Sequence, residues 1–240
     1  KLAIIGGTGM TKLDGLEIIR REAVYTPYGE TSGFLIFGKL NEREICFLPR
    51  HGHSHTIPPH KVNYRANIWA LKSFGITDVI AVNAVGGIAK NTPPGRVVIP
   101  DQIIDYTYGR EHTFSDGNNP NVQHIDFTMP YSEELRIELI SAAEKANVEI
   151  VEDGVYAVTQ GPRLETVAEV KRLVNEGCTL IGMTGMPEAG LARELGLNYV
   201  SCAFVVNWAA GRGELDIHAD IEKYLNKGMQ SVRAILKEFI

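Results

Sequence analysis

Leu2-Ala3-Ile4-Ile5-Gly6-Gly7-Thr8-Gly9, at the beginning of the 240-residue sequence, joins a short apolar run to a glycine-rich turn. An apolar run of this length that ends in glycine is typical of a buried β-strand. The same pattern recurs along the chain. It predicts strands at residues 2–5, 34–37, 45–49, 79–83, 97–99, 154–159, 180–183 and 200–206.

Segments with helical spacing of apolar residues lie between these strands, at residues 60–74, 132–146, 165–176, 187–195 and 219–239. Ser132 with the two glutamates after it forms a helix start, because a hydroxyl caps free N–H groups and acids favour the positive end. Pro187-Glu188 opens the helix predicted at 187–195 in the same sense. Strands that alternate with helices predict an α/β fold with a mostly parallel sheet covered on both faces. No repeat or linker divides the sequence, so we expect a single domain over residues 1–240.

The composition narrows the class of protein. Lys and Arg total 24 against 29 Asp and Glu, and this net charge of -5 argues against a nucleic-acid partner. No apolar run approaches the roughly 18 residues that span a bilayer, and the first residues lack the features of a secretion signal. Cys46, Cys178 and Cys202 are far apart, which favours buried thiols over a disulfide or a zinc site. We therefore expect a cytoplasmic protein without nucleic-acid or membrane partners.

Two turns after predicted strands suit an anion. In Gly6-Gly7-Thr8-Gly9, glycines let backbone N–H groups approach an anion and Thr8 adds a hydroxyl, although a turn without a ligand is the plainer interpretation. The spacing is not the G-x-G-x-x-G of a dinucleotide site. In Arg50-His51-Gly52-His53-Ser54-His55, three alternating histidines suggest a metal, but carboxylate or thiolate support is missing. Arg50 and His51 as donors favour an anion, and His53 and His55 remain open as a solvated loop.

Four further polar groups follow predicted strands. Asn83 precedes a Gly-Gly turn, Thr184 follows Met183, and Asn207 ends the last strand, while Glu165 is the first residue of a predicted helix. The plainer alternatives are a bend at Asn83, a cap at Asn207, a core position for Met183 and, for Glu165, an acid that complements a helix dipole. Because the carboxyl ends of strands meet at one edge in α/β folds, the set together predicts a site for one anion and one polar heterocycle, without a metal.

Several motifs in combination resemble one family. They are Ile4–Gly9, Thr26-Pro27-Tyr28-Gly29, Arg50–His53, Val62–Lys72, Gly161-Pro162-Arg163, and Gly182-Met183-Thr184 followed by Pro187-Glu188. Over nearly its whole length the chain resembles the trimeric purine nucleoside phosphorylases, particularly the methylthioadenosine phosphorylase branch. Residues 81–88 and 183–189 resemble bacterial S-methyl-5'-thioinosine phosphorylases most closely. The resemblance implies a single three-layer α/β/α domain with a central mixed sheet, a homotrimer, purine salvage, and phosphate as co-substrate without a cofactor or metal.

The resemblance also implies roles for individual residues. Phosphate would be bound by Thr8, Arg50, His51, Asn83, Ala84 and Thr184. The base would contact Leu164, Glu165 and Asn207, and the ribose would contact Met183. The 5' group would enter an apolar pocket that includes Ile221 and is completed by His124 of a neighbouring subunit. Asn207, Glu165 and His51 are the expected catalytic residues.

Two positions bear on the base. The adenine-specific branch has Asp where this chain has Asn207 and Ser where it has Glu165. A 6-oxopurine presents an N1–H donor and an O6 acceptor, which match the Glu165 carboxylate and the Asn207 amide. A buried mismatch there costs about 1–3 kcal/mol. We therefore expect phosphorolysis of S-methyl-5'-thioinosine to hypoxanthine and 5-methylthioribose 1-phosphate.

The alternatives are a methylthioadenosine phosphorylase and a 6-oxopurine (inosine or guanosine) nucleoside phosphorylase. Relatives that prefer a free 5'-hydroxyl have a His in the helix after the base-binding Asn. Ile221 lies near that position and favours a methylthio group, while His218, one turn earlier, is the competing candidate. A metal-dependent hydrolase built on the three histidines and a non-catalytic nucleoside-binding protein are the more distant alternatives.

Overall fold

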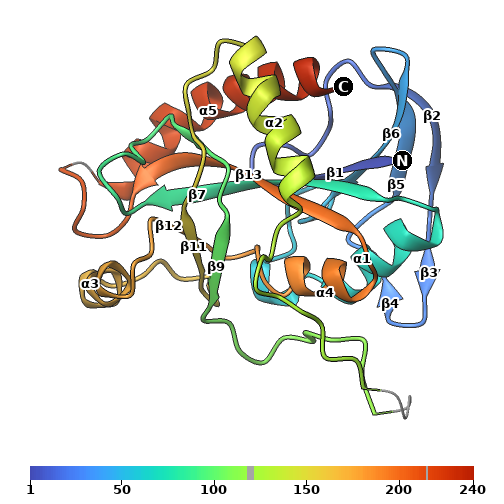
Figure 1. Ribbon diagram of the computed structural model, residues 1–240, viewed down its shortest axis with the longest axis horizontal. Coiled ribbons are helices and arrows are strands. Elements are labelled where there is room, and N and C mark those ends of the chain that lie inside the picture. The colour runs from blue at the N-terminus through green and yellow to red at the C-terminus, as the bar shows by residue number, and fades with distance from the viewer. Residues whose placement is uncertain (118–121, 215) are drawn as a thin grey trace.

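The computed structural model describes residues 1–117, 122–214 and 216–240 (Figure 1). Eleven strands of the described residues form one sheet, whose main path runs β10-β8-β13-β7-β1-β6-β5-β2. Their bounds are β1 Leu2–Gly6, β2 Glu17–Glu22, β5 Leu35–Leu40, β6 Arg43–Pro49, β7 Asp78–Gly87, β8 Val97–Val98, β9 Gln102–Asp105, β10 Ile150–Val151, β11 Val155–Val158, β12 Leu180–Gly182 and β13 Asn198–Trp208. A separate hairpin consists of β3 Tyr25–Thr26 and β4 Gly29–Glu30.

The sheet is mixed. Strands β6, β1, β7 and β13 pair in parallel through its centre. Antiparallel pairings join β5 to β6, β2 to β5, β8 to β13 and β12 to β7. The parallel centre follows from the strand–helix alternation in the sequence, and the antiparallel β5–β6 pair follows from its two-residue connection at Asn41 and Glu42, which have φ angles of 48° and 64°. The predicted α/β class with a central mixed sheet is confirmed.

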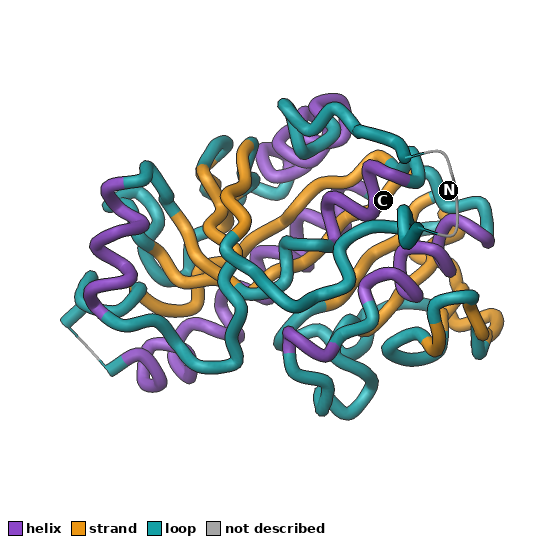
Figure 2. Tube along the Cα trace, turned by 90° about the horizontal axis from the view of Figure 1, so that it is seen from below, coloured by secondary structure: helices purple, strands orange, loops and turns teal. Residues whose placement is uncertain are grey.

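Helices cover both faces of the sheet, as Figure 1 and the turned view in Figure 2 show. On one face lie α2 and α5, whose apolar side chains join a core cluster with β1, β7 and β13, and on the other lie α1 and α4. Helix α3 packs against β11 and β12. The bounds are α1 Tyr64–Ser73, α2 Glu133–Lys145, α3 Val167–Asn175, α4 Glu188–Glu194 and α5 Ile217–Phe239, with a 3₁₀ turn at Pro59–Lys61.

The first strand shows how one apolar run serves two cores. Successive side chains of a strand point to opposite faces. Leu2 and Ile4 therefore pack under α2 and α5, whereas Ala3 and Ile5 pack under α1 and α4. Each buried isoleucine contributes roughly 1.5–3 kcal/mol. This is why β1 has no polar alternation in its sequence.

Capping residues set the helix boundaries. The predicted start at Ser132 is confirmed, because its side chain accepts a hydrogen bond from the Leu135 N–H. The helix predicted at 60–74 begins only at Tyr64, because Asn63 caps it. Helix α5 begins two residues earlier than predicted, since the Asp216 carboxylate accepts from the N–H groups of residues 218 and 219. None of the helices in the described part of the chain combines the length and apolarity needed to cross a membrane.

Candidate active site

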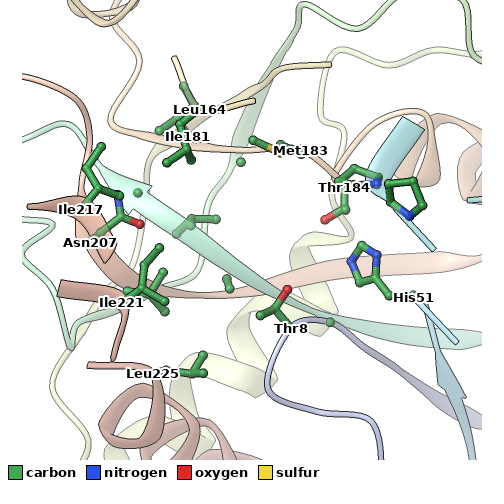
Figure 3. A pocket seen from close by; sticks show the side chains of 18 of the residues that line it. Thr8, His51, Leu164, Ile181, Met183, Thr184, Asn207, Ile217, Ile221 and Leu225 are labelled. Atoms are coloured by element: carbon green, nitrogen blue, oxygen red, sulfur yellow. The ribbon is translucent and has the colours of Figure 1, made fainter. Parts of the chain in front are cut away.

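A cavity of about 390 Å³ opens at the carboxyl ends of the central parallel strands (Figure 3). Strands β1, β6, β7 and β13 run in the same direction, so the residues that follow them meet at one edge. The sequence-predicted residues that line this cavity are Thr8, Arg50, His51, Ala84, Leu164, Glu165, Met183, Thr184, Asn207 and Ile221. Asn83 and His124 do not line it. Residues distant in sequence thus form one site.

One end of the cavity collects hydrogen-bonding groups that suit an anion. Figure 3 shows the side chains of Thr8, His51 and Thr184 around a common space. The turn after β1 packs closely against β7: a Cβ on Gly7 would lie only 2.5 Å from the Val82 carbonyl oxygen. Only glycine permits this close approach. The turn therefore brings Thr8 to the same space as the other two groups.

Arg50 is fully buried and its charge is compensated inside the protein. Its Nε and Nη2 each donate to a Glu188 oxygen at 2.7 Å, and its Nη1 donates to the Val82 carbonyl at 2.9 Å. Glu188, the first residue of α4, is also fully buried and accepts from the Tyr199 hydroxyl at 2.8 Å. Burial lowers the pKa of Arg50, but the Glu188 carboxylate and the tyrosines Tyr199 and Tyr64 outweigh it and the pKa is raised. The guanidinium keeps only part of its donor capacity for an anion.

His51 is neutral and has one nitrogen already engaged. Burial and the Arg50 charge lower its pKa from 6.5 to about 4. Its Nδ1 lies 2.8 Å from the Ile57 carbonyl oxygen, which only accepts, so Nδ1 carries the proton. In the neutral ring Nε2 is then an acceptor. His51 therefore suits a protonated phosphate oxygen, P–OH, rather than acting as a second donor as the sequence had suggested.

Asn83 stands behind the cavity wall, with 1% of its surface exposed. Its Nδ2 donates to Thr184 Oγ1 at 3.0 Å, and its Oδ1 accepts from the Ser201 hydroxyl at 2.8 Å. Only its neighbours Ala84 and Thr184 reach the cavity. Any effect of Asn83 on a bound anion therefore passes through Thr184.

The opposite end presents an acid and an amide. Glu165 Oε1 accepts from the Thr159 hydroxyl at 2.7 Å, which leaves Oε2 available. Asn207 Nδ2 donates to the Trp208 carbonyl at 2.8 Å, which leaves its second N–H and its Oδ1 available. A β-bulge between Val205 and Asn207 shifts the strand register just before this amide. Together Glu165 and Asn207 offer one strong acceptor and one donor–acceptor group.

Apolar side chains form the wall beside Asn207. Ile217, Ile221 and Leu225, four residues apart on α5, present one helical face to the cavity (Figure 3). His218 is exposed and does not line the cavity. Of the two candidates for the 5' position, Ile221 is therefore the one at the site.

The remaining histidines divide into separate environments. His55 lines the cavity, with its Nε2 3.2 Å from Thr8 Oγ1, whereas the His53 ring packs near Phe34. Across the described ranges 1–117, 122–214 and 216–240, no group of three or more His, Cys, Asp or Glu side chains is arranged to hold a metal. His124 is exposed on the segment before α2. Its role at a neighbouring subunit stays a prediction.

Arg110, which the sequence did not single out, holds two backbone segments next to the cavity. Its buried guanidinium donates to the carbonyl oxygens of Met183 at 2.8 Å, Met186 at 2.7 Å, Gln160 at 2.8 Å and Thr159 at 3.3 Å. It also donates to the Gln160 side chain at 3.0 Å. An arginine within a long polar loop looks solvated in sequence, so no local pattern announces this role.

Known proteins that are similar to this chain in sequence or structure are named as phosphorylases. The phosphorylase superfamily matches residues 1–240. A protein of Pseudomonas syringae pv. tomato named "Probable S-methyl-5'-thioinosine phosphorylase" is 53% identical over 98% of this chain and 96% of its own length. The 6-oxopurine nucleoside phosphorylase of Pyrococcus furiosus is 43% identical over 97% of this chain and 89% of its own. The methylthioadenosine phosphorylase of Schistosoma mansoni, solved with adenine, superposes with a TM-score of 0.92 at 33% identity, covering 100% of this chain and 90% of that one.

Proposed function

The chain belongs to the phosphorylase superfamily, and from this premise we propose that it cleaves S-methyl-5'-thioinosine with phosphate to give hypoxanthine and 5-methylthioribose 1-phosphate. It is thus a pentosyltransferase of the purine nucleoside phosphorylase type. One observation carries the proposal. A single cavity brings together the hydrogen-bonding side chains of Thr8, His51 and Thr184 at one end, Glu165 and Asn207 at the other, and an apolar wall from α5 beside Asn207.

The base-binding pair supports a 6-oxopurine. The free Oε2 of Glu165 accepts from the N1–H that only the oxo form of the base presents, and the free N–H of Asn207 donates to O6 or N7. An adenine would place its N1 lone pair against the carboxylate. Such an unpaired buried contact costs about 1–3 kcal/mol, which corresponds to about 5- to 150-fold in selectivity.

The α5 wall supports a methylthio group at the 5' position. Ile217, Ile221 and Leu225 offer no hydrogen-bond partner to a 5'-hydroxyl, and a hydroxyl buried without one costs about 1–3 kcal/mol. A sulfur and methyl group instead gain from leaving water. Inosine remains the second candidate substrate, because the same Glu165–Asn207 pair fits its base and the Pyrococcus relative carries the 6-oxopurine name.

The reaction is a displacement at the anomeric carbon. The bond from C1' to N9 breaks and its electron pair leaves with the base, while a phosphate oxygen forms the new bond to C1'. Phosphate held by fixed groups below the ring stabilises the positive charge that develops on the sugar. The His51 Nε2 lone pair orients the phosphate by accepting a hydrogen bond from its P–OH group. Asn207 hydrogen-bonds the purine more strongly as negative charge builds on it, and this difference between ground and transition state accelerates the reaction.

We further propose a cytoplasmic homotrimer that acts in purine salvage and uses phosphate as co-substrate without a cofactor or metal. The exposed His124 is free to complete the 5' pocket of a neighbouring subunit, as the family resemblance implies. Cys46, Cys178 and Cys202 are buried and unpaired, as is usual in a reducing compartment. Light scattering in solution measures the subunit number directly.

Base release from inosine, adenosine and their 5'-methylthio derivatives, with and without phosphate, tests the substrate. We expect phosphate-dependent release that is fastest with methylthioinosine. Asn207→Ala should lower kcat, whereas Asn198→Ala, at the exposed start of the same strand, should not. Release at equal rates without phosphate, or normal turnover by Asn207→Ala on every oxopurine nucleoside, contradicts the proposal.

A further inference from the structure

Three buried polar side chains connect the interior of the sheet to the anion end of the cavity. Ser201 on β13 donates from its hydroxyl to Asn83 Oδ1 at 2.8 Å. Asn83 on β7 donates from Nδ2 to Thr184 Oγ1 at 3.0 Å. Thr184 follows β12 and lines the cavity. This series of hydrogen bonds begins at Ser201, whose surface is 1% exposed, and ends at the space shared by Thr8 and His51.

The Asn83 amide determines the direction in which these hydrogen bonds are donated. An amide oxygen only accepts and an amide nitrogen only donates. Because Ser201 supplies a proton to Oδ1, the Asn83 nitrogen faces Thr184. Thr184 Oγ1 then accepts a hydrogen bond from Asn83, which leaves its own O–H free to donate into the cavity that Thr184 lines. There it is available to donate to an anion.

The reversed amide would have the opposite effect on the site. With Oδ1 of Asn83 facing Thr184, the threonine proton would be donated inward. The oxygen lone pairs of Thr184 would then face the anion and repel it. The favourable orientation is held by the hydrogen bond that the Ser201 hydroxyl donates to Asn83 Oδ1 at 2.8 Å. The neighbours of Ser201 on β13, Val200 and Cys202, are apolar and fully buried, so they offer Asn83 no alternative partner.

We propose that Ser201 is a positioning residue of the phosphate site: through Asn83 it fixes the Thr184 hydroxyl as a donor toward phosphate. This inference rests on the proposed function, which makes phosphate the anion. It assigns Asn83 an indirect role, since Asn83 orients Thr184 and does not line the cavity. It also explains a serine in a strand segment that is otherwise apolar.

The test compares Ser201→Ala with Cys202→Ala. The two residues are adjacent on β13, both are buried, and each substitution removes one heavy atom, but the side chains point to opposite faces of the sheet. We expect Ser201→Ala to raise the KM for phosphate about five- to tenfold, the size of one hydrogen bond, with the KM for methylthioinosine and kcat at saturating phosphate unchanged. Cys202→Ala should leave both KM values unchanged.

Asn83→Asp provides a second variant of nearly the same shape. Its carboxylate accepts from both Ser201 and Thr184, turns the Thr184 proton inward and repels the anion, so the phosphate KM should rise more than in Ser201→Ala. Calorimetric titration with inorganic phosphate repeats the comparison without turnover. An unchanged phosphate KM and affinity in Ser201→Ala, or equal changes in both KM values, overturns the inference. Lack of phosphate-dependent cleavage by the unmodified protein would instead overturn the proposed function.

Discussion

Replacing Glu188 by Gln tests how the protein keeps Arg50 charged in its interior. The side chains of both residues are fully buried and form two contacts of 2.7 Å. Removing one partner of such a pair leaves an uncompensated charge, which costs about 3–5 kcal/mol. The Gln side chain keeps the shape and one acceptor, so we expect a loss of about 3 kcal/mol in the free energy of unfolding. For a chain of this length that lowers the Tm by about 6–12 °C.

Phosphate should reverse part of this loss. Once Glu188 no longer neutralises the guanidinium, a bound anion is its remaining counter-charge at the cavity. Phosphate should therefore bind more tightly to Glu188→Gln than to the unmodified protein, by about tenfold or 1.4 kcal/mol. Because a ligand stabilises the folded state according to its affinity, the rise in Tm on adding phosphate should be larger in the variant.

The assay is thermal unfolding in phosphate-free buffer and across a phosphate titration, with chloride held constant. Glu169→Gln is the matched control, because Arg163 and Glu169 make the same two-pronged contact, at 2.7 and 2.9 Å, on the exposed surface. Exposed pairs contribute only about 0–1 kcal/mol, so its Tm should hardly change. A Tm for Glu188→Gln equal to that of the control, or an equal phosphate shift in all three proteins, would refute the reasoning.

Three further predictions concern the base and the pH dependence. Asn207→Asp should shift the ratio of kcat/KM values from methylthioinosine toward methylthioadenosine; an unchanged ratio would mean that base choice is set elsewhere. The pKa of His51, lowered from 6.5 to about 4 by burial and Arg50, means that the unfolded chain binds this proton more readily. Stability from this group should therefore be complete above pH 6.5 and fall by about 2 kcal/mol on acidification to pH 5, and urea unfolding should show less loss in His51→Gln. Thr159→Val should lower kcat/KM for methylthioinosine about five- to tenfold by removing the donor to Glu165, while Thr159→Ser keeps it; equal rates for both variants would contradict this orienting role.

The sequence predicts the interior of the fold better than its edges. Strands β1, β7 and β13 are recognisable because both of their faces are buried, which makes them continuous apolar runs. Strand β2, with the sequence Glu-Ile-Ile-Arg-Arg-Glu, was not predicted. It is an exposed edge strand paired with β5, so neither a buried run nor an alternation marks it. Strand length at the edges is determined by pairing partners that lie far away in sequence.

The site residues also fall into those that the sequence predicts and those that it does not. Residues that follow strands directly, such as Thr8, His51 and Thr184, were predictable from topology and line the cavity. Thr159, which directly follows β11, and Ser201, within buried β13, were not, because a lone hydroxyl at such a position has no local signal and takes its role from a hydrogen-bond partner. Glu188 was assigned only to a helix start, yet it neutralises Arg50 across 138 residues of sequence. Long-range hydrogen bonds are the part of the site that sequence patterns do not reveal.

The loop arginine, Arg110, gives the cavity a mechanical property. One guanidinium donates to the backbone carbonyl oxygens of Met183 and Met186 after β12, and to those of Thr159 and Gln160 in the segment that leads to Glu165. These two segments therefore share one hydrogen-bonding anchor. A displacement of the polar loop that carries Arg110 would therefore act on both segments at once, and through them on the shape of the cavity.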